Sequence, residues 1–229
     1  MFRRVLILAA VLAAAPVPPA GADGIAMLET GRGQRAQAFS IVWRDDGATV
    51  RVNTPLRDVS LLLVDGAPYA VRRMNRNFVV LTLSGLGEKA AGLLPGFGSA
   101  RTRAASVDSL RAVGPKAVVA GIPGKTYEMV WTDTAGARHT DRMVLSDDPL
   151  AVEMAAAIAA FETALGHDPG PRAVAVRDLG LGLLRSDEVR LTSASNREPR
   201  PGTFTLPAEP QTLDDIVSAI GRMRRGGSP

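Results

Sequence analysis

Apolar residues alternate with polar ones along most of the chain between Phe39 and Leu145, and this rhythm restricts the fold more than any other feature. In residues 38–44 the side chains of Phe39, Ile41 and Trp43 fall on one face of an extended chain. Segments 48–54, 58–64, 68–73 and 78–84 follow the same rule, and their connections are too short for a crossover helix. The sequence therefore predicts an antiparallel meander of about five strands.

Two further parts of the chain extend this prediction. Residues 106–113 favour another strand, and residues 125–133 and 137–146 form a hairpin around Thr134-Ala135-Gly136. The Gly/Ala-rich stretch 84–105 breaks the alternation, and we expect a short helix and a loop there. Together these segments predict a mainly β (α+β) fold, in which one bent antiparallel layer has its apolar face covered by a few helices.

The period changes to that of a helix after Asp148. Asp148 is a typical N-cap, Pro149 suits the first turn and Gly166 suits the end, so we expect a helix over 149–165. Its apolar stripe consists of Leu150, Met154, Ile158, Phe161 and Leu165. We also expect short closing strands at 188–194 and 203–207, and an amphipathic helix with a basic tail over 211–229.

The first 22 residues have the three parts of a secretory signal peptide. Arg3 and Arg4 precede a short apolar run, and Ala20-Gly21-Ala22 offers a cleavage site after Ala22. The run is too short for a spanning helix, which predicts a periplasmic protein with one β domain over 23–210. The chain has no cysteine, so no disulfide stabilises that domain. Cleavage would remove Arg3 and Arg4 and lower the net charge from +4 to +2, which is too small to predict a nucleic-acid partner.

Two glycine motifs imitate nucleotide sites. Gly124-Lys125-Thr126 matches the end of a phosphate-binding loop, but the required earlier glycine is Val119 and the chain continues as a strand. Gly85, Gly87 and Ala90, with Asp108 beyond them, match a dinucleotide fingerprint, but they follow an antiparallel meander. We therefore predict no nucleotide and no other cofactor.

No catalytic or metal-binding constellation is visible, and we predict that the protein is not an enzyme. The two histidines, His139 and His167, have Asp141 and Asp168 nearby, but a zinc site needs three or four ligands. We interpret both as solvated polar residues. Arg222, Arg224 and Arg225 offer a small basic surface for an envelope protein or an anionic membrane.

Three segments carry a family resemblance. Residues 50–71 look like a strand pair leading into an Asp-Gly-x-x-Tyr hairpin, residues 119–149 look like a second hairpin entered through a Gly121–Gly124 turn, and residues 203–210 look like a closing Phe-x-Leu-Pro strand end. In this order, after a signal peptide, they resemble the LolA/LolB-like lipoprotein-carrier superfamily of bacterial envelope proteins. The resemblance implies an incomplete, strongly curved β-barrel closed by helices.

The resemblance also implies a function. The protein would bind or carry a lipid or acyl chain in the concavity of the sheet. The implied ligand-binding residues are Phe39, Ile41, Trp43, Leu61, Leu63, Phe78, Val80, Met129 and Trp131. The alternative is a packed core without a cavity, in a structural or protein-interaction module of the envelope that binds through a sheet edge or the basic tail.

Overall fold

A computed structural model describes residues 23–31, 36–45, 47–56, 58–85, 103–212 and 215. Their strands form one sheet of twelve. The strands are β1 (Gly24–Thr30), β2 (Gln37–Trp43), β3 (Val50–Asn53), β4 (Val59–Val64), β5 (Ala67–Met74), β6 (Asn77–Thr82), β7 (Ala104–Val119), β8 (Ile122–Asp133), β9 (Arg138–Ser146), β10 (Gly182–Arg185), β11 (Val189–Ser195) and β12 (Pro210–Gln211). The helices are α2 (Pro149–Ala164) and α3 (Pro171–Asp178).

The sheet has the order β12-β6-β5-β4-β3-β2-β1-β11-β10-β9-β8-β7. Every pairing is antiparallel except that of β12 with β6, and β12 and β7 are the two free edges. The predicted meander is confirmed as β2–β6, and the predicted second hairpin as β8–β9. Both residues of the Asp65-Gly66 turn have positive φ, as a tight hairpin requires.

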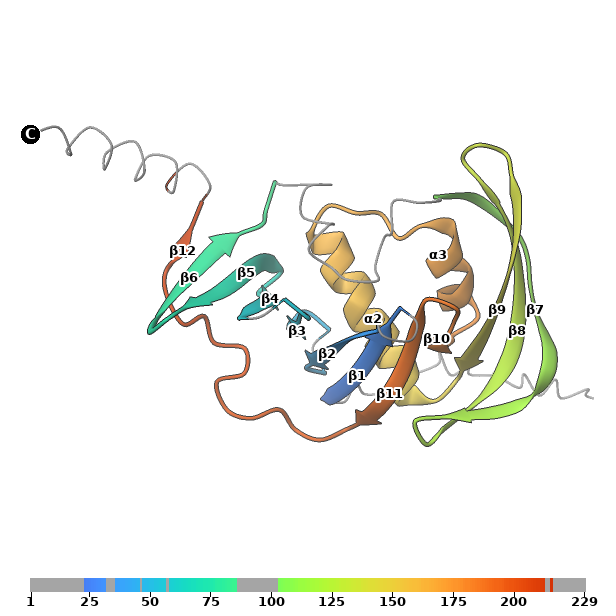
Figure 1. The fold of residues 1–229 in the computed structure, drawn as a ribbon, viewed down its shortest axis with the longest axis horizontal. Coiled ribbons are helices and arrows are strands. Elements are labelled where there is room, and N and C mark those ends of the chain that lie inside the picture. The colour runs from blue at the N-terminus through green and yellow to red at the C-terminus, as the bar shows by residue number, and fades with distance from the viewer. Residues whose placement is uncertain are drawn as a thin grey trace, which may run out of the picture.

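Helix α2 confirms the helix expected over 149–165. The Asp148 side chain accepts a hydrogen bond from the backbone N–H of Leu150 at 3.0 Å, and Gly166 has φ +81° beyond the last turn. The helix packs across β1, β2, β3, β5 and β10, whereas α3 packs against β7 and β10 (Figure 1). No helix in the described part of the chain is long and apolar enough to cross a bilayer.

Two sequence predictions about turns and strands are wrong. Residues 203–207 form no strand, and Thr203 and Phe204 lie in a turn. The chain turns at Ala120-Gly121 rather than over Gly121–Gly124, because β7 continues through Pro115 to Val119. A register shift between Ala112 and Lys116 accommodates Pro115. Proline lacks a backbone N–H, and an edge strand tolerates this because one side of it makes no ladder hydrogen bonds.

The sheet is also covered differently from the prediction, which had helices on one apolar face only. In the structure, part of the opposite face is covered as well. Segment 196–209, here called the C-terminal strap, leaves β11 and runs along the meander to β12 (Figure 1). Leu206 and Ala208 of the strap pack on Leu62, Val71 and Val80, on the side of the meander opposite α2. Consecutive residues Leu61, Leu62 and Leu63 are consequently all buried, which a half-exposed strand would not allow.

The meander, together with its neighbour β1, therefore has two faces, which are named here by what covers them. The helix face packs against α2 and consists of Ala26, Leu28, Phe39, Ile41, Trp43, Val50, Val52, Leu61 and Leu63. The strap face is the opposite side of the same strands and includes Ile25, Ser40, Val42, Arg51, Asn53, Ser60, Leu62, Val71 and Val80. A second core, under α3, is formed by Met129, Trp131, Met143, Leu145 and Leu181.

Some expectations fall outside the described residues. They are the signal peptide over 1–22, most of the Gly/Ala-rich segment 84–105, and the C-terminal helix with Arg222, Arg224 and Arg225. The structure also contains elements that the sequence did not predict, namely β1, β10, β12 and α3.

Candidate functional site

The structure distributes the nine implied ligand-binding residues over three places. Phe39, Ile41, Trp43, Leu61 and Leu63 lie together on the helix face, each at most 2% exposed. Met129 and Trp131 lie in the core under α3. Val80 packs under the C-terminal strap, and Phe78, two residues earlier on β6, is 42% exposed. The expectation that all nine share one concave face is therefore wrong for four of them. Strand alternation places Phe78 and Val80 on the strap face, and Met129 and Trp131 pack in a separate core.

Among the helix-face residues, Trp43 has a polar side-chain group, the indole N–H, that makes no hydrogen bond with the described residues. Its indole ring lies over Gly24, the partner residue on β1, and a Cβ at Gly24 would collide with the ring. The indole Nε1 is buried and has no hydrogen-bond acceptor among the described residues. A buried donor without a partner costs about 1–3 kcal/mol, so an acceptor oxygen arriving at Nε1 would be stabilised.

The side of α2 that faces the sheet is apolar. Its buried residues are Ala151, Met154, Ala157 and Phe161. The α2 residue Glu162 is half-buried beside this stripe, and burial raises the pKa of its carboxyl group. The helix and the sheet are thus held together mainly by apolar contact, which is non-directional and which another apolar surface can replace.

The surroundings of Trp131 are occupied by protein side chains. Its indole Nε1 donates a hydrogen bond to Asp141 Oδ2 at 2.8 Å, and its ring stacks on His139 with 4.3 Å between centroids. Arg172 of α3 lies 4.8 Å from the Trp131 ring and forms an ion pair of 2.7 Å with Asp141. These contacts attach α3 to the β8–β9 hairpin and surround the Trp131 ring with protein partners.

Asp133 organises the turn between β8 and β9. It accepts hydrogen bonds from the backbone N–H groups of Ala135 and Ala137, and it bonds His139 Nε2 at 2.8 Å. The hydrogen bond from His139, followed by the one from Ala137, lowers the pKa of Asp133. His139 is therefore a partner in a turn rather than a freely solvated residue.

The other residues weighed for chemistry do not assemble into a site. Gly124, Lys125 and Thr126 lie inside strand β8, where no helix follows them. His167 follows α2, and its Nε2 is buried without a partner in the described part of the chain, so its interpretation as solvated is wrong. Among the described residues no group of three or more His, Asp or Glu side chains is placed to hold a metal ion.

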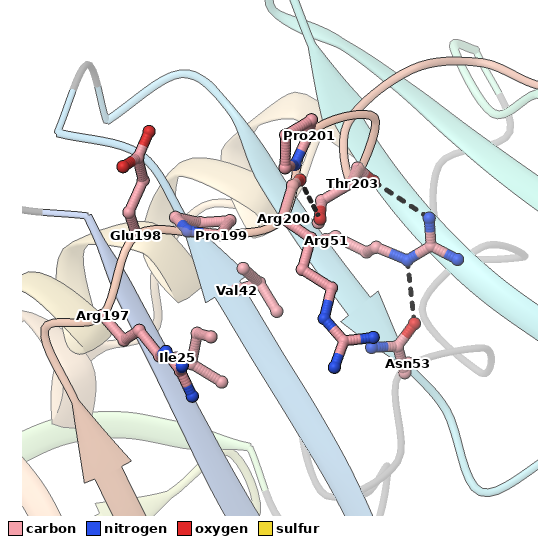
Figure 2. A pocket seen from close by; sticks show the side chains of 10 residues that line it. All are labelled: Ile25, Val42, Arg51, Asn53, Arg197, Glu198, Pro199, Arg200, Pro201 and Thr203. Atoms are coloured by element: carbon pink, nitrogen blue, oxygen red, sulfur yellow. Dashed lines mark hydrogen bonds between the residues drawn. The ribbon is translucent and has the colours of Figure 1, made fainter.

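A further candidate site lies on the strap face, and sequence reasoning missed it. A pocket of about 780 Å³ separates β1–β3 from the C-terminal strap. It is lined by Ile25, Val42, Arg51, Asn53, Arg197, Glu198, Pro199, Arg200, Pro201 and Thr203 (Figure 2). Strand alternation directs Arg51 and Asn53 away from the helix face, and the strap covers them. The sequence feature that points to a covered strap face is Leu62, which lies on that face of β4 between two leucines of the helix face.

Arg51 joins the strand to the strap. Its Nε donates to Asn53 Oδ1 at 2.8 Å, and one Nη donates to the carbonyl of Thr203 at 2.9 Å (Figure 2). The other Nη donates to Ser60 Oγ at 3.0 Å. Asn53 in turn donates to Ser40 Oγ at 2.8 Å. Burial lowers the pKa of Arg51.

Comparisons with known proteins add no identification. No protein-family model matches the chain, and neither the curated proteins nor the solved structures give a match.

Proposed function

We propose that this protein is a non-catalytic binding protein of the bacterial envelope that holds a lipid or acyl chain between α2 and the helix face. The observation that carries the proposal is the buried Trp43 indole N–H, which has no acceptor among the described residues. In this proposal an ester or carboxyl oxygen of the ligand accepts that hydrogen bond, while the acyl chain replaces contacts between α2 and the sheet. Strong curvature and an incomplete barrel, which the resemblance implies, belong to this proposal too.

The apolar character of the interface supports the proposal. The helix-face residues and the buried residues of α2 have hydrocarbon or thioether side chains, apart from the indole of Trp43. An acyl chain that enters there would leave water, with a gain of about 0.8 kcal/mol per buried CH₂, while α2 would give up part of its own apolar contact with the sheet. Periplasmic location after cleavage at Ala22 is part of the same proposal.

A second candidate function is the packed interaction module. The near-complete burial of Phe39, Ile41 and Leu61 favours it, because these side chains already have protein partners. In that case α2 stays in place, the interior takes no ligand, and the protein acts only through its surface. The two candidates differ in whether α2 can leave the sheet.

The two tryptophans allow a direct test. Trp43 lies under α2 and Trp131 lies under α3, so Trp131→Phe leaves a reporter of the helix face and Trp43→Phe leaves a reporter of the other core. Titration with a fatty acid brominated near the end of its chain should quench the fluorescence of Trp131→Phe strongly and that of Trp43→Phe weakly. Because Trp43→Phe also removes the proposed donor, its affinity should fall as well.

Lipid extraction completes the test. Protein purified from its own envelope should yield a co-purifying lipid by mass spectrometry. Absence of quenching in Trp131→Phe, together with absence of lipid in repeated preparations, would reject the carrier proposal and leave the packed module. Equal quenching of both variants would reject the helix-face location.

A further inference from the structure

The pocket on the strap face has the size of a small-molecule site. Its volume of about 780 Å³ lies within the range of about 300–1,000 Å³ that is typical of such sites. One wall is the strap face, with Ile25 and Val42 as its apolar part. The opposite wall is the strap, where Pro199 and Pro201 hold the backbone stiffly. The pocket thus combines fixed apolar surfaces with a few polar groups.

The guanidinium of Arg51 is fixed in position but only partly used. Its three hydrogen bonds all go to uncharged acceptors, on Asn53, Ser60 and Thr203. A guanidinium has five N–H donors, so two remain for a ligand. No carboxylate of the described residues forms an ion pair with Arg51. A half-buried cation of this kind is stabilised by an anion that can approach it.

Two more arginines line the same pocket. The side chains of Arg197 and Arg200 form no hydrogen bond or ion pair with the described residues, and both are exposed. Glu198 is the only acidic residue of the lining, so the pocket carries a net charge of +2. Figure 2 shows the Glu198 carboxylate directed away from the guanidinium groups of Arg51 and Arg200. It also borders a neighbouring pocket, which Asp23, Arg44 and Asp45 line.

We propose that this pocket binds a small organic anion, a carboxylate or a phosphate, that carries an apolar group. Arg51 supplies the oriented donors, Arg197 and Arg200 supply mobile charge, and Ile25 and Val42 contact the apolar group. Arginine suits this role because its planar fork matches carboxylate and phosphate oxygens. The site is separate from the helix face, and its occupation does not depend on the acyl ligand proposed above.

The main alternative is that Arg51 only fixes the strap. A substitution of Arg51 cannot distinguish the two roles, because it would also release Thr203 and Asn53. The test therefore leaves Arg51 in place and changes the other two arginines, Arg197→Ala with Arg200→Ala. A matched control removes the same charge elsewhere: Arg185→Ala with Arg190→Ala, two exposed and directly paired residues of β10 and β11 outside the lining.

Calorimetric titration with four probes tests the site. Phenyl phosphate, benzoate and inorganic phosphate are the anions, and benzyl alcohol is the neutral probe. We expect phenyl phosphate or benzoate to bind the wild type, and the one that binds more tightly identifies the charged group. The Arg197/Arg200 variant should lose at least about tenfold in affinity, while the Arg185/Arg190 variant keeps it. Inorganic phosphate should bind more weakly than phenyl phosphate, because it lacks the apolar group.

Several results would overturn the proposal. They are failure of both organic anions to bind at millimolar concentration, equal affinity for benzyl alcohol, and equal loss in the two double variants. Unchanged melting temperatures of both variants would show that any loss of binding is not a loss of fold. Because short aromatic probes do not test acyl binding next to Trp43, failure here leaves the proposed function standing.

Discussion

The two faces of the meander differ in what covers them and in what lies beneath the cover. The helix face is apolar along every strand, and a regular helix closes it. The strap face changes along the sheet: Leu62, Val71 and Val80 form an apolar patch, whereas Ser40, Arg51, Asn53 and Ser60 form a polar one. An irregular segment covers both parts.

This difference in composition means that the apolar surfaces mainly stabilise the fold, whereas the polar patch can recognise a specific ligand. Apolar burial is non-directional and stabilises the fold wherever it occurs. A polar patch under a cover costs free energy unless each group finds a partner, and it adds little net stability when it does. The polar half of the strap face therefore adds little as a core, and its polar groups suit a charged ligand, whereas the helix face suits an apolar one.

The largest expected effect comes from two neighbouring leucines, one on each face. Leu61 points to the helix face and Leu62 to the strap face, and both are 0% exposed. Each Leu→Ala change should lower the free energy of unfolding by about 2–5 kcal/mol, as in other packed cores. Urea denaturation measures both, and Leu56→Ala, at a residue 57% exposed, is the control. A cost below about 1 kcal/mol for Leu62→Ala would show that the strap is not a lasting cover.

The next effect concerns the close approach of α2 to β10. A Cβ at Gly182 would collide with the carbonyl oxygen and carbon of Ala151, which are backbone atoms and cannot rotate away. Gly182→Ala should therefore destabilise the protein by about 1–3 kcal/mol or more, by pushing α2 off the sheet. Gly170→Ala, where no atom lies near the added Cβ, should change the melting temperature much less. Equal melting temperatures for the two variants would show that α2 moves without cost.

The sequence predicts the helix face, but it does not predict that the strap covers the opposite face. The alternation that contains Phe39, Ile41 and Trp43 predicts a buried face whatever the rest of the chain does. The strap has no periodicity, because Pro199, Pro201 and Pro207 exclude regular structure and its contacts are non-local. Thr203–Pro207 was taken for a strand on composition, but its backbone partner is the side chain of Arg51, which no local pattern records.

Other misses have comparable causes. Helix α3 has only eight residues and no buried residue of its own, so it lacks an apolar stripe that could signal it. It is positioned by Arg172, through contacts with Trp131 and Asp141. Residues of β7 beyond 113 were missed because Gly114 and Pro115 end most strands, and only an edge strand with a register shift can continue past them.

A third, smaller effect tests the polar half of the strap face. Arg51→Met should cost about 1–3 kcal/mol, because the carbonyl of Thr203 and the side chains of Asn53 and Ser60 lose their common donor. Hydrogen exchange measured by mass spectrometry should become faster in the strap but stay unchanged in α2. Arg200→Met, which removes an arginine without these bonds, is the control. Unchanged exchange in the strap would mean that Leu206 and Ala208 hold it alone.

The smallest effect is a pH dependence that belongs to the helix face. Burial raises the pKa of Glu162 in α2 above the ordinary 4.5, so the folded state holds the proton more tightly than the unfolded state does. Stability from this group is complete below pH 4.5 and is lost as the pH rises through the folded-state pKa. Glu162→Gln should therefore stabilise the protein at neutral pH and have no effect below 4.5. Urea denaturation at both pH values checks this, with Glu209→Gln as the exposed control. Equal stabilisation by both variants at neutral pH would assign the effect to net charge. The carboxylate of Glu162 would then not be desolvated beside the helix face, and it would offer no counterpart to the half-buried Arg51 of the strap face.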